Sequence, residues 1–143
     1  MIPYLEREKT LSPRAIVPTR VLVVDGEPLI RWSICAALAA AGFDAVAASN
    51  AAEATRIANE WPPPRVVLVD LRHPDVEGRE LLAHIRSVYP DCRFLIMTTD
   101  PGALGLDKRR ADGVEVVEKP FDLVRITERI TRLAAAGDGE IQP

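Results

Sequence analysis

The sequence predicts an α/β domain with a doubly wound, five-stranded parallel sheet. Two observations lead to this fold class. Short apolar runs rich in β-branched residues recur along the chain, as expected for strands that are buried on both faces of a sheet. A stretch with helical spacing or helix-capping residues follows each run, and such regular alternation is typical of parallel sheets covered by helices on both faces.

The elements of the first half are separated by proline, glycine and capping residues. Proline is tolerated in the first turn of a helix, glycine often follows the last turn, and serine or asparagine caps a helix start. We expect a strand at Val21–Val24, a helix from Pro28 to Gly42, a weaker strand at Phe43–Ala48, a helix capped by Ser49 or Asn50 that runs to about Glu60, and a strand at Arg65–Val69.

The second half continues the same alternation, with one weak helix. Gly102 and Gly105 lower the helix propensity of that segment by about 1 kcal/mol each relative to alanine. We expect a helix at Gly78–Tyr89, a strand at Phe94–Met97, a weak helix opened by Asp100 and Pro101, a strand at Val114–Val117, and a last helix capped by Asp122.

Length and composition predict one domain. The chain has 143 residues, of which 48% are hydrophobic and 27% charged, close to the averages of globular proteins. We expect a flexible N-terminal extension at 1–19, a folded body at 20–136 and a polar tail at 137–143. No room remains for a second domain, so we expect a stand-alone module.

Charge and cysteine usage exclude several classes. The 18 basic and 21 acidic residues give a net charge of −3, which argues against a dedicated nucleic-acid binder. No apolar run approaches the length of a membrane span, and the N-terminus lacks a signal-peptide core. Cys35 and Cys92 are not spaced as metal ligands, which fits a reducing cytoplasm. We expect a cytoplasmic protein that contacts neither nucleic acid nor membrane.

Polar side chains follow four of the predicted strands, namely Asp25, Asp70, Thr98 and Lys119. Singly, each has an ordinary explanation as a turn former, helix cap or surface charge. Together they meet at the carboxyl edge of the sheet, where functional residues gather in such folds. Clustered carboxylates require positive charge, which Lys119 and a hard divalent cation would supply. This set suits phosphoryl transfer onto Asp70 as nucleophile, with Lys119 and Thr98 holding the phosphoryl oxygens.

Four stretches carry a family resemblance: Val21–Asp25 with Glu27-Pro28, Val67–Asp75 with Gly78, Ile96–Thr98, and Glu118–Phe121. In this order and spacing they resemble the receiver domain of two-component response regulators, over 20–136. The resemblance implies a flavodoxin-like receiver fold and a phosphorelay signalling role rather than an enzyme, beyond catalysis of its own phosphotransfer. It also implies a cis peptide bond between Lys119 and Pro120.

The resemblance also implies partners and a metal. A histidine kinase or phosphotransfer protein would phosphorylate Asp70, and Mg²⁺ would be held by Asp25, Asp70 and the backbone carbonyl of Arg72. Signalling would follow by protein–protein contact with a downstream protein, on the face formed by the fourth helix, fifth strand and fifth helix. A homodimer is left open.

One residue departs from the family pattern. Receivers usually carry two adjacent acids after the first strand, and the second, a direct metal ligand, is here Gly26. Glu27 could reach in as a substitute metal ligand, or Asp25 could shift to direct ligation. Alternatively, the chain is a degenerate receiver that binds a partner without phosphorylation. A third hypothesis is a small aspartate-nucleophile phosphohydrolase, because Asp25-Gly26-Glu27 superficially resembles the nucleophile motif of that class.

Overall fold

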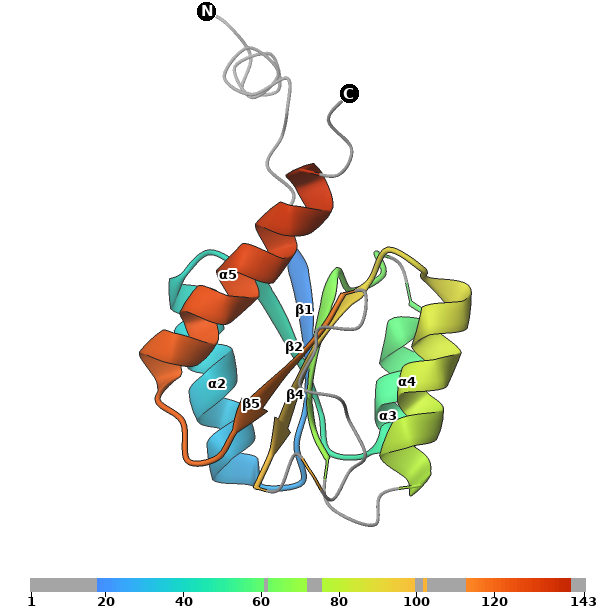
Figure 1. The fold of residues 1–143 in the computed structure, drawn as a ribbon, viewed down its shortest axis with the longest axis horizontal. Helices are drawn as coiled ribbons and strands as arrows, with labels where there is room; N and C mark the ends of the chain where they lie inside the picture. Colours follow the sequence, from blue (N-terminus) through green and yellow to red (C-terminus); the bar gives the residue numbers. More distant parts are fainter. Residues whose placement is uncertain (1–17, 61, 72–75, 100–101, 103–112, 140–143) are drawn as a thin grey trace, which may run out of the picture.

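The computed structural model describes residues 18–60, 62–71, 76–99, 102 and 113–139. Within these residues, five strands and four helices follow one another along the chain (Figure 1). They are β1 (Arg20–Val24), α2 (Pro28–Ala40), β2 (Asp44–Ala48), α3 (Ala51–Ala58), β3 (Val66–Asp70), α4 (Val76–Val88), β4 (Arg93–Thr98), β5 (Val114–Glu118) and α5 (Leu123–Gly139).

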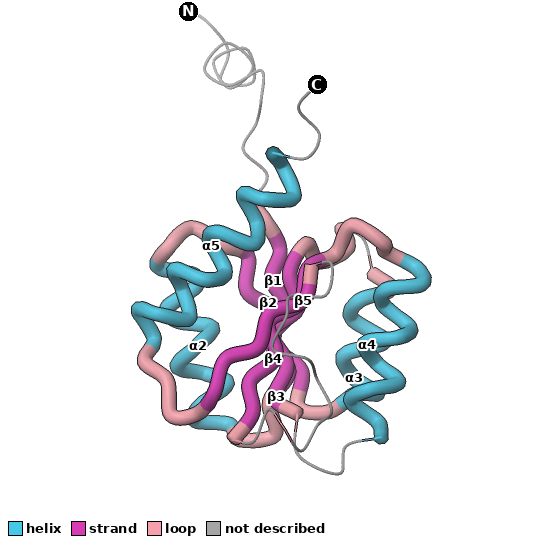
Figure 2. The backbone as a smooth tube through the Cα atoms, viewed as in Figure 1, coloured by secondary structure: helices cyan, strands magenta, loops and turns pink. Residues whose placement is uncertain are grey.

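The five strands form one parallel sheet in the order β2-β1-β3-β4-β5. Helices α2 and α5 cover one face of the sheet, and α3 and α4 cover the other (Figures 1 and 2). The strand order reverses at β1, which lies between β2 and β3. In open α/β sheets, ligands bind at the carboxyl edge beside such a switch point. The predicted fold class is confirmed.

Two hydrophobic cores, one on each face of the sheet, explain why the central strands β1, β3 and β4 are apolar over most of their length. Along β1, Leu22 and Val24 pack into the core beneath α3 and α4, while Val21 and Val23 pack into the core beneath α2 and α5. Alternate residues of a strand point to opposite faces, so a strand covered on both sides needs apolar residues at every position.

Local capping sets the ends of the helices. Of the two predicted caps, Asn50 caps α3, because its Oδ1 accepts the backbone N–H of Glu53 at 2.8 Å. Asp122 caps α5 as expected, accepting the N–H of Arg125 at 2.7 Å. Helix α2 starts at Pro28 and ends at Ala40, and Gly42 beyond it has a φ of +96°. Helix α5 reaches Gly139, past the boundary expected at 136.

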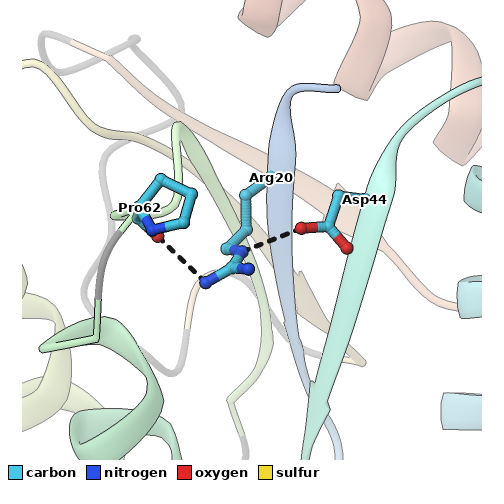
Figure 3. A network of polar contacts seen from close by, with 3 residues as sticks. All are labelled: Arg20, Asp44 and Pro62. Carbon is cyan, nitrogen blue, oxygen red and sulfur yellow. Dashed lines mark hydrogen bonds and ion pairs between the residues drawn. The ribbon is translucent and has the colours of Figure 1, made fainter. Parts of the chain in front are cut away.

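Polar contacts hold the amino edge of the sheet together, opposite the edge with the predicted site. Arg20 at the start of β1 pairs with Asp44 at the start of β2, with 3.0 Å between Nε and Oδ2 (Figure 3). The same guanidinium donates to the carbonyl of Pro62, just before β3, at 3.0 Å. One side chain thus ties two strands to the segment leading into a third.

Some predictions fall on residues outside the description. The weak helix expected after Asp100, most of the N-terminal extension and the end of the tail belong to this group. Among the helices that are described, none combines the length and the hydropathy needed to span a bilayer.

Candidate functional site

The structure brings the predicted strand-end residues to one edge of the sheet. Asp25 directly follows β1, Asp70 and Thr98 are the last residues of β3 and β4, and Lys119 directly follows β5. Strands β1, β3, β4 and β5 are consecutive neighbours in the sheet. Because all strands are parallel, their carboxyl ends meet at this edge, as the sequence predicted.

Lys119 reaches across β4 to the end of β3. Its Nζ lies 2.9 Å from Asp70 Oδ1, and the two side chains are only 18% and 4% exposed. The backbone N–H of Lys119 donates to the carbonyl of Thr98 at 2.8 Å, and this hydrogen bond fixes the Lys119 backbone beside the end of β4. The Lys119–Pro120 peptide bond is cis, as the family resemblance implied. Thr98 is 2% exposed.

Asp25 has a buried carboxylate whose two oxygen atoms have different surroundings. It is 2% exposed, and its Oδ1 accepts the backbone N–H of Glu27 at 2.8 Å. Its Oδ2 is buried and has no hydrogen-bond partner among the described residues. Burial is the main cause that raises the pKa of Asp25 above 3.8; the Glu27 N–H lowers this pKa, Asp70 raises it, and Lys119 lowers it. A carboxylate oxygen without a donor is available to a cation.

Arg31 is a neighbour of the site that sequence reasoning missed. From the first turn of α2, its Nη1 donates to the carbonyl of Asp25 at 2.6 Å. The contact holds the turn that presents the Asp25 carboxylate. A basic residue one helical turn beyond a strand-end acid is a signal that could have found it.

A pocket of about 360 Å³ opens at this edge, beside the switch point between β1 and β3. Asp25, Gly26 and Glu27 line it from the end of β1, and Asp70 from the end of β3. The remaining lining comes from the start of α3 and the first turns of α4, namely Ser49, Asn50, Ala51, Glu77, Gly78 and Leu81, together with Val24 and Val69. The pocket lining thus includes four acidic residues, and carboxylate oxygens are ligands that Mg²⁺ and Ca²⁺ prefer.

Gly26 leaves part of this pocket open. Among the described residues, a Cβ at Gly26 would have only the Ser49 carbonyl oxygen as a neighbour, at 4.0 Å. The φ of Gly26 lies outside the left-handed region, so the backbone does not require glycine here. A residue with a side chain could therefore occupy this position without backbone strain, but this chain has glycine.

The donor set fits Mg²⁺ with one protein ligand fewer than the family pattern. Across the described ranges, no three acidic, histidine or cysteine side chains converge on a single metal position. Asp25 and Asp70 remain, and Mg²⁺ in proteins is commonly held by one or two carboxylates together with water and phosphate oxygens. Glu27 is exposed and lines the pocket, and its ligand role stays a prediction. Arg72, whose carbonyl was expected to join, lies outside the described residues.

Comparison with known protein families identifies the family of the chain that carries this site. The family model described as "Response regulator receiver domain" matches residues 21–131. The chain belongs to this family. This receiver domain therefore comes from the two-component systems, in which receivers are generally signalling modules rather than enzymes and work with histidine kinases or phosphotransfer proteins.

Curated relatives are regulators of transcription. The receiver domain is 31% identical over 117 residues to the probable transcriptional regulatory protein TcrX of Mycobacterium tuberculosis, covering 81% of this chain and 50% of the relative. It is 30% identical over 125 residues to the DNA-binding transcriptional regulator NtrC of Escherichia coli, covering 86% of this chain and 26% of the relative. The chain thus spans about half or less of the length of these two relatives.

Solved structures share the fold. A two component transcriptional regulator AraC from Clostridium phytofermentans superposes with a TM-score of 0.70 at 29% identity, covering 87% of this chain and 99% of that one. A response regulator receiver protein from Sinorhizobium medicae gives a TM-score of 0.74 at 20% identity, covering 86% and 99%. The second likeness bears on the fold alone.

Proposed function

We propose that this receiver domain accepts a phosphoryl group on Asp70 from a histidine kinase or phosphotransfer protein, in the cytoplasm, and signals by protein–protein contact. The observation that carries the proposal is the 2.9 Å pair between Lys119 Nζ and Asp70 Oδ1 at a pocket lined by Asp25. An ammonium group in this position neutralises the nucleophile at rest and can follow the charge onto a phosphoryl oxygen.

The transfer is an in-line displacement at phosphorus. An Asp70 carboxylate oxygen forms the new P–O bond, while the P–N bond of the phosphohistidine donor breaks and its electron pair stays on the imidazole nitrogen. Lys119 holds negative charge on the phosphoryl oxygens, and the Thr98 hydroxyl donates to one of them. Asp25 and Asp70 would hold Mg²⁺, which supplies charge neutralisation when bound.

Acetyl phosphate tests the phosphoacceptor directly. We expect the protein, incubated with acetyl phosphate and Mg²⁺, to gain the mass of one phosphoryl group, with acetate as the leaving group. Asp70→Asn is the matched control and should gain nothing. Absence of the added mass in the wild type over a wide Mg²⁺ range would contradict the proposal.

Gly26 favours a second candidate, a degenerate receiver that binds its partner without phosphorylation. The missing carboxylate lowers the affinity for the cation on which phosphotransfer depends. The two candidates differ in what Asp70→Asn does to complex formation with a partner captured from the native cell. A phosphorylation-dependent receiver loses the complex, whereas a degenerate receiver keeps it.

The phosphohydrolase hypothesis has less support from the geometry. Its nucleophile would be Asp25, which is 2% exposed and has Oδ1 engaged by the Glu27 N–H. The output face expected from the family is described here only for β5 and α5, because its remaining helix falls outside the described residues. The downstream partner that would contact this face, and a possible homodimer, remain part of the proposal.

A further inference from the structure

We infer that this receiver domain is free of Mg²⁺ at rest and binds the cation together with the phosphoryl group, because Gly26 leaves the resting site one carboxylate short. The inference deepens the proposed function and rests on it. In the resting protein, Asp25 and Asp70 alone bind the cation too weakly. After phosphorylation, a phosphoryl oxygen supplies the further ligand.

In the resting site, Oδ2 of Asp25 is the natural inner ligand of a cation. This oxygen is buried and has no hydrogen-bond partner within the described part of the chain, and Asp25 is one of the residues that line the pocket. The other oxygen, Oδ1, is engaged by the Glu27 N–H. A desolvated carboxylate oxygen in this condition favours a positive charge beside it. Asp25 is therefore ready for a cation in the fold as it stands.

The resting site lacks a further acid beside Asp25. Lys119 is already paired with Asp70, which places one positive charge on the second carboxylate and reduces its attraction for a cation. Among the described residues, a Cβ at Gly26 would meet no atom closer than the Ser49 carbonyl oxygen at 4.0 Å, and the backbone would accept a side chain there without strain. Loss of an outer-shell partner commonly costs roughly tenfold to a hundredfold in metal affinity, and loss of a direct ligand costs more.

Phosphorylation of Asp70 supplies what the resting site lacks. A phosphoryl group on Asp70 brings negative oxygens to the pocket, and Mg²⁺ binds readily to one or two carboxylates plus phosphate oxygens. It also draws the Lys119 ammonium away from the carboxylate. By linkage, whatever the phosphoryl group adds to cation affinity, the cation adds to phosphoryl affinity. The cation therefore occupies the site in the phosphorylated state and not in the resting state.

The wild type and three variants, read out by thermal unfolding, test the inference: Gly26→Asp, its uncharged isostere Gly26→Asn, and Asp25→Asn. Each is titrated with Mg²⁺ alone and with Mg²⁺ plus beryllofluoride, which attaches to a carboxylate as a phosphoryl mimic. A ligand that binds the folded state raises the unfolding midpoint once its concentration exceeds Kd.

With Mg²⁺ alone, we expect Gly26→Asp to bind at least about tenfold more tightly than the wild type, and Gly26→Asn to stay near the wild type. With beryllofluoride, the wild type and Gly26→Asp should both respond to Mg²⁺, and Asp25→Asn should respond in neither case. Equal affinity of the wild type and Gly26→Asp for Mg²⁺ alone overturns the inference. No beryllofluoride response in either protein instead overturns the proposed function, so the two failures are distinguishable.

Discussion

The ion pair between Lys119 and Asp70 leads to a stability prediction whose magnitude can be worked out from the structure. Lys119→Met removes the ammonium group and keeps most of the apolar side chain. At an effective dielectric constant of about 20, the attraction of unit charges 2.9 Å apart is about 6 kcal/mol, and the cost of desolvating both groups offsets part of it. Because Asp70 would stay buried without its cation, we expect the free energy of unfolding to fall by about 3 kcal/mol.

Urea denaturation followed by circular dichroism measures this loss as a lower midpoint with an unchanged slope. The matched background is Asp70→Asn, in which the carboxylate charge is already gone. There, Lys119→Met should cost less than about 1 kcal/mol, because the pairwise term has been removed. An equal loss in both backgrounds would show that Lys119 stabilises the fold by packing, and would refute the assignment of the pair as the main interaction.

Three further predictions concern Asp25 and two local features. Asp25→Asn should raise the free energy of unfolding in metal-free buffer at pH 7 by about 1 kcal/mol. Burial raises the pKa of Asp25 above 3.8, so the wild type loses stability as the pH rises from 3.8 through this raised pKa. The stability advantage of Asp25→Asn over the wild type should therefore be smaller in urea titrations at pH 4. Asn50→Ala should cost about 1 kcal/mol by loss of the α3 cap, with Asn50→Ser largely retaining it. Gly42→Ala, at a φ of +96° and with no described atom within 4 Å of the new Cβ, should cost about 1 kcal/mol of backbone strain in the same assay.

The sequence predicted strands and helices well where the chain is apolar or capped, and less well at polar ends. Strand β4 was expected at Phe94–Met97 but includes Arg93 and Thr98, because pairing with β3 and β5 continues past the apolar run. Helix α4 was expected to start at Gly78 but starts at Val76, and Gly78 is buried within its first turn. Hydrogen bonding, which sets these ends, leaves no mark in hydrophobic periodicity.

At the site, residue type and strand position were enough to predict the convergence of Lys119 and Asp70. The different surroundings of the two Asp25 carboxylate oxygens were not predictable. They depend on a turn that gives Oδ1 a backbone donor and leaves Oδ2 without one among the described residues. The same turn changes the contribution of Glu27. Its side chain was considered as a substitute ligand, yet its backbone N–H is what the structure shows holding Asp25.

The two cores draw on different lengths of the chain. Among the described residues, the buried members of the core beneath α3 and α4 lie between Leu22 and Ile96, and Val114 and Val116 of β5 pack against them. The opposite core takes Ile126 and Ile130 from α5 and stays half covered until the last helix emerges. A nascent chain that ends before α5 leaves apolar side chains of β1, β3 and β4 on that face partly uncovered, and transiently exposed apolar surface of this kind favours aggregation.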